Sequence, residues 1–370
     1  MRILVLNSGS SSLKADLYEF EREESEHFPP PEPLSRQNVE WISSIDSLLE
    51  SIIHHAGRVD AVGHRIVHGG PLYRQPIVIT AEVRQALAGC AEIAPIHTGR
   101  ELEVLDATTN ALGTAIPQIA VFDTAFHETL SPAAYTYALP YDWLIKDGIR
   151  RYGFHGLSYQ YSSRRAAEML GASHVNRLLV CHLGSGASLC AIRNGKSVDT
   201  TMGFTPLEGL AMGRRSGSVD PAILFYLQRQ KGYSAPDLDR ILNGESGLAG
   251  LSGTSGDLRH ILEAREGGDA KAQLAFDVYL HSLVRHAGMM IAVVGGIDAL
   301  VFTGGVGENS APVREALCER LACFGVLVDS GKNKQVKRDV AIHASSSQVR
   351  ILVIHAREEW EIARACARLV

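Results

Sequence analysis

The stretch Arg2-Ile-Leu-Val-Leu-Asn-Ser-Gly-Ser10 can be laid over Arg177-Leu-Leu-Val-Cys-His-Leu-Gly-Ser185, at an offset of 175 residues. Arginine, leucine, valine, glycine and serine coincide between the two copies. In each copy an apolar run predicts a buried strand, and the glycine and serine after it predict a tight turn. A second apolar run follows each turn, at 13–18 and at 188–192. Two such units half a chain apart predict two related domains.

The rest of the chain alternates short apolar runs with helical patterns, which is typical of a layered α/β fold. Buried strands are predicted at 3–6, 116–122, 178–181, 299–302 and 350–354. Helices are predicted at 45–56, 81–93, 158–170, 221–231, 270–294, 311–323 and 358–370. The acidic, proline-rich segment 19–35 is the exception, and it is predicted to be a solvated loop or hairpin excursion.

Composition bounds the kind of protein. A length of 370 residues favours two domains, and 45% hydrophobic with 21% charged residues is typical of a globular chain. The net charge of −5 provides no overall positive field for nucleic acid or an anionic membrane. The six cysteines form no Cys-x-x-Cys pair, which favours reduced thiols.

The first apolar run is too short for a signal peptide, and the most apolar later stretch is about half of the ~20 residues that a bilayer requires. We therefore expect a soluble, cytoplasmic protein.

The first candidate loop is Asn7-Ser-Gly-Ser-Ser-Ser-Leu-Lys14. Small residues let backbone N–H groups turn toward an anion, and Lys14 adds a charge suited to phosphate. Asn7 ends the strand, so its side-chain oxygen could face a hydrated Mg²⁺. The same residues are equally typical of an ordinary hairpin turn with a surface lysine.

Two further loops are rich in glycine. They are His182-Leu-Gly-Ser-Gly-Ala-Ser188 and Thr303-Gly-Gly-Val-Gly-Glu-Asn309, and the second is predicted to be a turn before a helix that begins near Ala311. The second loop fits neither a Walker loop nor the dinucleotide fingerprint. One such loop is weak support for phosphate binding. Three in one chain favour a nucleotide held between two domains.

Four clusters are polar where a plain scaffold has no need of polarity. Arg65 stands between two histidines in 64–70, and Asp123 directly follows a predicted strand, a usual place for active-site carboxylates. His155 lies beside glycines in 151–156, and 212–220 carries two adjacent arginines. Each cluster alone is also compatible with a solvated arginine or a structural histidine.

Together these clusters resemble the acetate kinase family, part of the superfamily that contains sugar kinases, actin and chaperone ATPases. The matching stretches run from the first strand to the last helix: 7–14, 64–70, 93–97, 122–127, 151–156, 182–188, 204–209, 212–221, 255–259, 302–309, and Glu358-Glu359 with 362–364. The resemblance implies a two-domain actin-like α/β fold, with a mixed sheet flanked by helices in each domain and the active site in the cleft between them. The first domain is expected to hold 1–122 with the returning helix 358–370, and the second 123–357.

The resemblance implies reversible phosphoryl transfer between ATP and acetate, giving ADP and acetyl phosphate. It implies Mg²⁺ as cofactor, a role that Mn²⁺ can also fill, and a homodimer, with no nucleic acid or membrane as partner. Carried over by position, Asn7 and Glu358 would hold the metal, and the catalytic residues would be Arg65, Asp123, His155 and Arg215. Arg65 would also bind the acyl substrate, whose methyl pocket would be formed by Val67, Ile96, Phe154 and Pro206. ATP would contact Lys14, His182, Leu183, Gly184, Ser185, Gly186, Asp257, Leu258, Arg259, Gly305, Val306, Gly307, Glu308 and Asn309.

The chain departs from the family pattern at a few positions. Serine replaces asparagine at Ser185, Thr98-Gly99 replaces Asn-Pro, Arg214 replaces threonine, Ser218 replaces aspartate, and Ala356-Arg357 replaces Thr-Asn. We expect Arg357 to neutralise Glu358 in part and so to weaken metal binding.

Two alternatives remain for function. Propionate or butyrate kinase would use the same catalytic set, because one methylene changes discrimination by only ~1–3 kcal/mol. A non-catalytic nucleotide-binding member would need the ATP loops but not Arg65, Asp123, His155 and Arg215, so the presence of these four favours an enzyme.

Overall fold

The computed structural model describes residues 1–9, 12–21, 30–41, 44–90 and 95–370, with the side chains of 95–98 left out. The described chain forms two compact units. Unit 1 comprises Met1–Glu128, Phe154–Tyr161 and Arg357–Val370, and unit 2 comprises Thr129–Gly153 and Ser162–Ala356. The expected domain boundaries put 123–128 and 154–161 in the second domain, whereas the compact units group both segments with unit 1.

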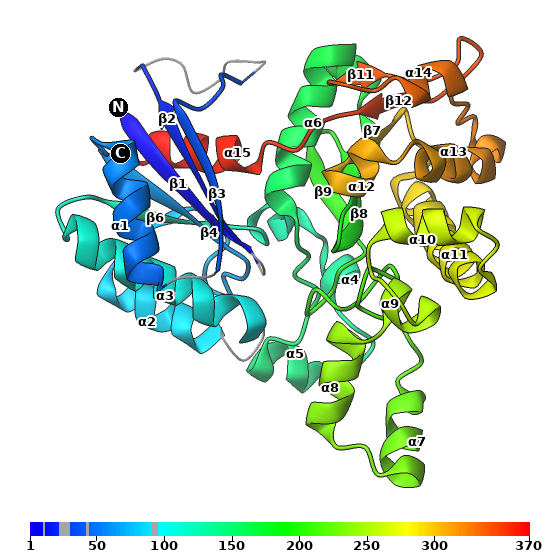
Figure 1. Ribbon diagram of the computed structural model, residues 1–370, viewed down its shortest axis with the longest axis horizontal. Coiled ribbons are helices and arrows are strands. Elements are labelled where there is room, and N and C mark those ends of the chain that lie inside the picture. Colours follow the sequence, from blue (N-terminus) through cyan, green and yellow to red (C-terminus); the bar gives the residue numbers. More distant parts are fainter. Residues whose placement is uncertain (10–11, 22–29, 42–43, 91–94) are drawn as a thin grey trace. The chain divides into compact units, whose positions relative to one another are not determined.

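Unit 1 is built on a mixed sheet with strand order β3-β2-β1-β4-β6-β5 (Figure 1). Its strands are β1 (Arg2–Ser8), β2 (Ser12–Glu19), β3 (Ser35–Glu40), β4 (Ala61–Ile66), β5 (Ile77–Val78) and β6 (Gln118–Phe122). β1, β2 and β3 pair antiparallel, β1, β4 and β6 pair parallel, and β5 closes one edge antiparallel to β6. The helices are α1 (Ile45–Ala56), α2 (Ala81–Gly89), α3 (Pro95–Leu112) and α15 (Glu358–Ala367).

The sequence of unit 1 explains both faces of this sheet. α1 begins at the N-cap Ser44, buries apolar residues at helical spacing, and ends at Gly57, whose φ is 67°. Leu4, Leu6 and Val62 share a core with α1 and α3. Gly63 faces the other way, since a Cβ there would lie 2.6 Å from Cys366 Sγ and 2.7 Å from Ile362 Cγ2 of α15. The helices therefore cover both faces.

Unit 2 repeats this plan in the strand order β11-β12-β10-β7-β8-β9. Its strands are β7 (Arg177–Leu183), β8 (Ala187–Arg193), β9 (Lys196–Thr200), β10 (Ala299–Thr303), β11 (Val340–Ala341) and β12 (Arg350–Val353). β7, β8 and β9 pair antiparallel, β10 lies parallel to both β7 and β12, and β11 pairs antiparallel with β12. The two copies of the sequence repeat are thus the hairpins β1–β2 and β7–β8, which confirms two mixed sheets in an α/β fold.

The helices of unit 2 are α4 (Pro132–Tyr135), α5 (Tyr141–Asp147), α7 (Ala222–Lys231), α8 (Ala235–Gly244), α9 (Gly247–Ser252), α10 (Leu258–Glu266), α11 (Ala270–Val294), α12 (Gly304–Asn309), α13 (Ala311–Arg320) and α14 (Ser330–Lys334). α6 (Gly156–Leu170) begins in unit 1 and continues into unit 2. α11 matches its predicted bounds, set by the N-cap Asp269 and by Gly295 in the left-handed conformation.

Some predicted elements need correction. The predicted turn after β10 is instead the short helix α12, which the chain enters through Gly304 with a φ of 76°. The predicted helix 81–93 ends at Gly89, and its last residues lie outside the described chain. β4 and α3 were not predicted as elements, since polar residues interrupt their apolar patterns. All six cysteines are free thiols, as expected. In the described ranges no helix is long and apolar enough to cross a membrane.

Candidate functional site

Arg65 is the centre of the polar group in unit 1. It lies on β4, one residue before the strand ends, and Asp123 directly follows the neighbouring strand β6. Arg65 donates from Nε to Asp123 Oδ1 at 3.0 Å and from Nη2 to Asp123 Oδ2 at 2.6 Å. It also donates from Nη1 to Asn7 Oδ1 at 3.1 Å. Burial opposes its charge, but the carboxylates of Asp123 and Glu358 raise the pKa of Arg65, so the guanidinium stays charged.

The first turn of α15 brings two acidic side chains to the same group. Asn7 donates from Nδ2 to Glu359 Oε1 at 3.0 Å, and Lys14 Nζ lies 3.6 Å from the same oxygen. Burial opposes ionisation of Glu359, but Lys14 and these hydrogen bonds lower its pKa. Glu358 shows the opposite balance, because burial, together with the charges of Asp123 and Glu359, raises its pKa despite Arg65 and Lys14.

These residues fit a hydrated divalent cation. Within the described residues no three histidine, cysteine or acidic side chains form a cage that could hold a metal alone. Mg²⁺ does not need such a cage, because it keeps several waters and takes one or two carboxylates together with substrate phosphates. Glu358 offers a carboxylate crowded by two others, and Asn7 offers an amide oxygen, so the donor chemistry suits this ion.

His155 is positioned by a strained backbone beside Asp123. Its φ is 58°, a left-handed conformation that is costly for a residue with a side chain and often marks a functional site. Gly156 N–H donates to the Asp123 carbonyl oxygen at 2.9 Å. A Cβ at Gly156 would lie 2.1 Å from that oxygen, so only glycine permits this approach. The chain therefore fixes His155 next to the end of β6.

The residues predicted for the acyl pocket belong to different units, and each is described within its own unit. Val67 and Phe154 are both buried in unit 1. Pro206 lies in unit 2, where its carbonyl oxygen accepts from Arg215. The side chain of Ile96 lies outside the described residues. Sequence reasoning missed Glu101 on α3, which is 2% exposed and accepts from Val67 N–H at 3.0 Å. The stretch 101–105 holds two glutamates, Glu101 and Glu103, and its pattern does not distinguish the buried one from the exposed one.

In unit 2 the glycine-rich segments after β7 and β10 lie against each other. Gly184 N–H donates to the Gly186 carbonyl oxygen at 3.0 Å, which makes a tight turn after β7. A Cβ at Gly304 would lie 2.8 Å from the Leu183 carbonyl oxygen and 3.2 Å from His182 Nε2. The structure thus brings the predicted nucleotide residues 182–186 to the start of α12.

A further pair of loops joins this group. Gly213 N–H donates to the Ser185 carbonyl oxygen at 3.2 Å, and a Cβ at Gly213 would lie 2.8 Å from the Gly256 carbonyl oxygen. Asp257 follows as the N-cap of α10, and Arg259 pairs with it through Nε at 3.0 Å and Nη2 at 2.5 Å. The hydrogen bond from Arg259 lowers the pKa of Asp257 to about 2. Leu258 is buried between these two residues.

The other nucleotide candidates lie on α12. Glu308 Oε1 accepts from both Gly304 N–H and Ala356 N–H, each at 2.9 Å. This oxygen therefore ties the start of α12 to the chain that leaves β12. Asn309 donates from Nδ2 to the Gly305 carbonyl oxygen at 2.9 Å. Two further candidates lie between Gly305 and Glu308: Val306, which is half-buried, and Gly307, which is buried.

Arg215 differs from Arg65 in having no acidic partner within the described residues. It donates from Nη1 to the Pro206 carbonyl oxygen at 3.3 Å and contacts Met212 Sδ at 3.8 Å. Burial lowers the pKa of Arg215. Its neighbour Arg214 is exposed and reaches the Gly244 carbonyl oxygen at 3.4 Å. Ser218 Oγ accepts from Gly209 N–H at 3.0 Å and so closes the same loop.

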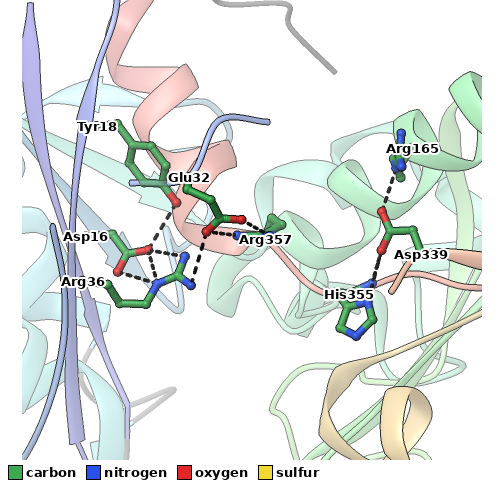
Figure 2. Close-up of polar contacts among 8 residues, drawn as sticks. All are labelled: Asp16, Tyr18, Glu32, Arg36, Arg165, Asp339, His355 and Arg357. Carbon is green, nitrogen blue, oxygen red and sulfur yellow. Dashed lines mark hydrogen bonds and ion pairs between the residues drawn. The ribbon is translucent and has the colours of Figure 1, made fainter. Parts of the chain in front are cut away.

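The unusual Arg357 is engaged away from Glu358. Figure 2 shows its guanidinium on Glu32, with Nη2–Oε1 at 2.6 Å and Nη1–Oε2 at 3.2 Å. Arg36 lies 3.8 Å from Glu32 and pairs with the buried Asp16 at 3.1 Å. The expected interaction of Arg357 with Glu358 is therefore replaced by an ion pair with the segment between β2 and β3.

The residues just before Arg357 are held within unit 2. Figure 2 shows Asp339 between Arg165 and His355, with Arg165 Nε at 2.7 Å and His355 Nδ1 at 3.2 Å. Burial opposes ionisation of Asp339, but these two partners lower its pKa. The passage of the chain from unit 2 to unit 1 is thus anchored by separate side chains on each side.

Comparison with known proteins places this geometry in a family. A family model described as the acetokinase family matches residues 35–364. The acetate kinase of Gloeobacter violaceus is 47% identical over an alignment of 401 residues that covers 99% of this chain and 98% of the relative. The acetate kinase of a Nostoc species is 45% identical over 406 residues and covers both chains fully.

Solved structures agree with the sequence relatives. The acetate kinase of Porphyromonas gingivalis superposes with a TM-score of 0.86 at 37% identity, covering 98% of each chain. A propionate kinase from Francisella tularensis superposes with a TM-score of 0.88 at 35% identity, also covering 98% of each chain. The predicted actin-like fold is thereby confirmed, and the chain belongs to the acetokinase family.

Proposed function

We propose that this chain catalyses reversible phosphoryl transfer between ATP and acetate, giving ADP and acetyl phosphate. The observation that carries this proposal is the Arg65 guanidinium, half-buried and charged, and oriented by Asp123 and Asn7 next to Glu358. Arg65 has five N–H donors, of which three are engaged in these bonds. The remaining donors can bind the carboxylate or acyl phosphate of a small substrate.

Asp123 acts in this scheme as a positioning carboxylate. Both of its oxygens accept from Arg65, so it fixes the fork of the guanidinium. Acetate is ionised at neutral pH and needs no strong general base. His155, held at the end of β6, and Arg215, which has no carboxylate partner in the described chain, would neutralise the transferring group.

The glycine-rich segments of unit 2 suit the nucleotide. Backbone N–H groups at 184–186 and at the start of α12 are natural phosphate donors, and the absent Cβ atoms allow close approach. When bound, Mg²⁺ would neutralise phosphate charge and lower the barrier to transfer. Glu358 and Asn7 would hold this ion, with Mn²⁺ able to take its place.

The acyl group is proposed to be acetate, with propionate as the second candidate. Val67 and Phe154 offer an apolar wall on which a methyl group could rest. Propionate is favoured as the alternative because a structure of the same fold and length is a propionate kinase.

An acyl-hydroxamate assay with acetate, propionate and butyrate tests the proposal. We expect product with acetate, greatest turnover with acetate or propionate, and no product in excess chelator. Arg65→Ala serves as the inactive control. Comparable turnover with chelator, or the absence of acyl phosphate with all three acids, would contradict the proposal.

A cytoplasmic homodimer is part of the same proposal. The six free thiols suit a reducing compartment. Helix α7 buries none of its side chains within the chain and exposes Ile223, Phe225 and Tyr226, which offers a surface for a second copy. Light scattering on the purified chain tests the dimer, and the mass of a single copy would contradict it.

A further inference from the structure

Glu101 is a buried carboxyl group in which only one of the two oxygens has a hydrogen-bond partner in the described chain. It lies on α3 with 2% of its surface exposed. Its Oε1 accepts from Val67 N–H at 3.0 Å, just beyond the end of β4, the strand that carries Arg65. Its Oε2 has no hydrogen-bond partner in the described part of the chain. A buried polar atom left without a partner is costly, so it calls for an explanation.

The surroundings favour the protonated form of this carboxyl group. Burial raises the pKa of Glu101 to about 8, although Val67 N–H and the charge of Arg65 act to lower it and Asp123 acts to raise it. Arg65 on β4 and Asp123 after β6 are the charged groups that act on it from the elements packed around α3. Burial lowers the pKa of nearby His68 to about 4, so that ring is uncharged. At neutral pH Glu101 is therefore a neutral acid.

A neutral carboxyl group has one O–H donor. Because Oε1 already accepts from a backbone N–H, the proton resides on Oε2, the oxygen without a partner. A buried acid kept neutral in this way is a known means of donating a hydrogen bond to an anion. Oε1 is bound to the N–H of Val67, two residues after Arg65, so Glu101 is held beside the strand end that carries Arg65.

We propose that Glu101 is a substrate-binding residue, which donates from its Oε2–H to the carboxylate of the acyl substrate held by Arg65. This inference rests on the proposed function and adds a second type of donor to the acyl site. Its bond to Val67 also holds the chain where the pocket wall begins. The buried O–H requires an acceptor oxygen on its ligand, and the carboxylate of a small acid supplies one.

The alternative is that Glu101 only clamps Val67. The two roles separate at high pH, because an ionised carboxylate still accepts from Val67 N–H but can no longer donate to the substrate and repels it. A glutamine at this position keeps an acceptor and a permanent donor, and a leucine keeps neither. Glu103, exposed on the same helix, provides the matched control.

The experiment measures KM for acetate and for ATP, with kcat, between pH 6.5 and 9.5. The proteins are wild type, Glu101→Gln, Glu101→Leu and Glu103→Gln. We expect Glu101→Leu to raise the acetate KM by roughly 10–100-fold, with the ATP KM changed by less than about twofold. The wild-type acetate KM should rise at alkaline pH, whereas that of Glu101→Gln should stay flat over this rise.

Two results would overturn the inference. One is an unchanged acetate KM in Glu101→Leu. The other is the same alkaline rise in Glu101→Gln as in wild type, which decides the matter even if the leucine variant does not fold. A wild-type protein that makes no acyl phosphate would instead refute the proposed function, so the two failures are distinguishable.

Discussion

In unit 1 the candidate site residues at the strand ends are Asn7, Arg65 and Asp123, whereas glycines, Gly184 and Gly304, directly follow β7 and β10 in unit 2. The sheets share one strand order, so the difference lies in the side chains and not in the frame. Unit 1 presents charged groups that orient one another through side-chain hydrogen bonds. Unit 2 presents backbone atoms, which approach closely because the side chains are absent. The same sheet can thus serve either type of anion recognition.

Among the charged residues of unit 1, substitution of Arg65 is expected to have the largest effect on activity. Arg65→Ala should lower kcat by at least about 10³-fold, because it would remove the charge proposed to face the transferring group and leave Asp123 without its Arg65 partner. Arg65→Lys should recover only part of the activity, since lysine lacks the planar fork. Steady-state kinetics of both variants check this, and a kcat for Arg65→Ala within tenfold of wild type would refute the role.

Arg215 tests whether unit 2 also needs a charged side chain. Arg215→Ala should lower kcat by roughly 10²–10³-fold, because this desolvated guanidinium has no acidic partner in the described chain and is available to an anion. Arg214→Ala, at the exposed neighbouring position, should change kcat by less than about threefold. If the two effects were reversed, Arg214 would be the residue that acts on substrate.

The stability of unit 1 should depend on pH through His64, one of its buried histidines. His64 Nε2 lies 2.7 Å from Gln118 Oε1, and burial lowers the pKa of His64 to about 4. The unfolded value is near 6.5, so this stabilisation is complete above pH 6.5 and is lost as the pH falls toward 4. In denaturant unfolding, the free energy of unfolding of wild type should fall by up to about 3 kcal/mol more than that of His64→Gln across this pH range.

His54 provides the control for this measurement, because it is exposed on α1. His54→Gln should follow the wild-type pH dependence. Parallel curves for His64→Gln and wild type would show that His64 does not carry the effect.

The backbone side of the comparison is tested by two adjacent glycines. Gly304→Ala should destabilise the fold by about 1–3 kcal/mol and raise the ATP KM by roughly tenfold, because φ is 76° and a Cβ would lie 2.8 Å from the Leu183 carbonyl oxygen. At Gly305 a Cβ would meet nothing within 4 Å, so Gly305→Ala should leave stability within about 0.5 kcal/mol. Thermal unfolding and ATP titrations distinguish them, and equal behaviour of the pair would contradict the steric argument.

The smallest effect is expected at Arg357. Its ion pair with Glu32 is partly exposed, so Arg357→Asn should cost at most about 1 kcal/mol of unfolding free energy. The half-saturating Mg²⁺ concentration should change by less than about twofold, because the guanidinium is engaged by Glu32. Glu32→Gln is the matched variant, and the double variant should show a non-additive stability. A large fall in the half-saturating Mg²⁺ concentration of Arg357→Asn would instead support the expected interaction of Arg357 with Glu358.

Local patterns predicted what depends on local structure. The paired apolar runs after Arg2 and Arg177 predicted both hairpins, because a strand followed by a glycine-serine turn is encoded within a few residues. The bounds of α1 and α11 followed from their caps. The position of Arg65 beside Asp123 required the register of β4 against β6, which the sequence alone did not supply.

Contacts between distant residues were beyond such patterns. Arg357 is adjacent to Glu358 in sequence, yet it pairs with Glu32, 325 residues away. Glu101 had no motif, and its importance comes from burial against Val67. The glycines after β10 predicted a turn. Gly304 does turn the chain with a positive φ of 76°, but the residues after it form the helix α12.

The return of α15 to the first sheet has a consequence for the order in which the protein is made. Trp360 and Ile362 are buried in unit 1, where Trp360 stacks on Phe20 with ring centroids 5.1 Å apart. The ribosome synthesises all of 129–356 before these residues emerge. This stretch belongs to unit 2, except for the short segment 154–161, which is part of unit 1. The sheet that is translated first therefore receives its covering helix α15 only after the second sheet has been translated. Until then one of its apolar faces lacks its cover, and a nascent chain in that state is a natural client for a chaperone.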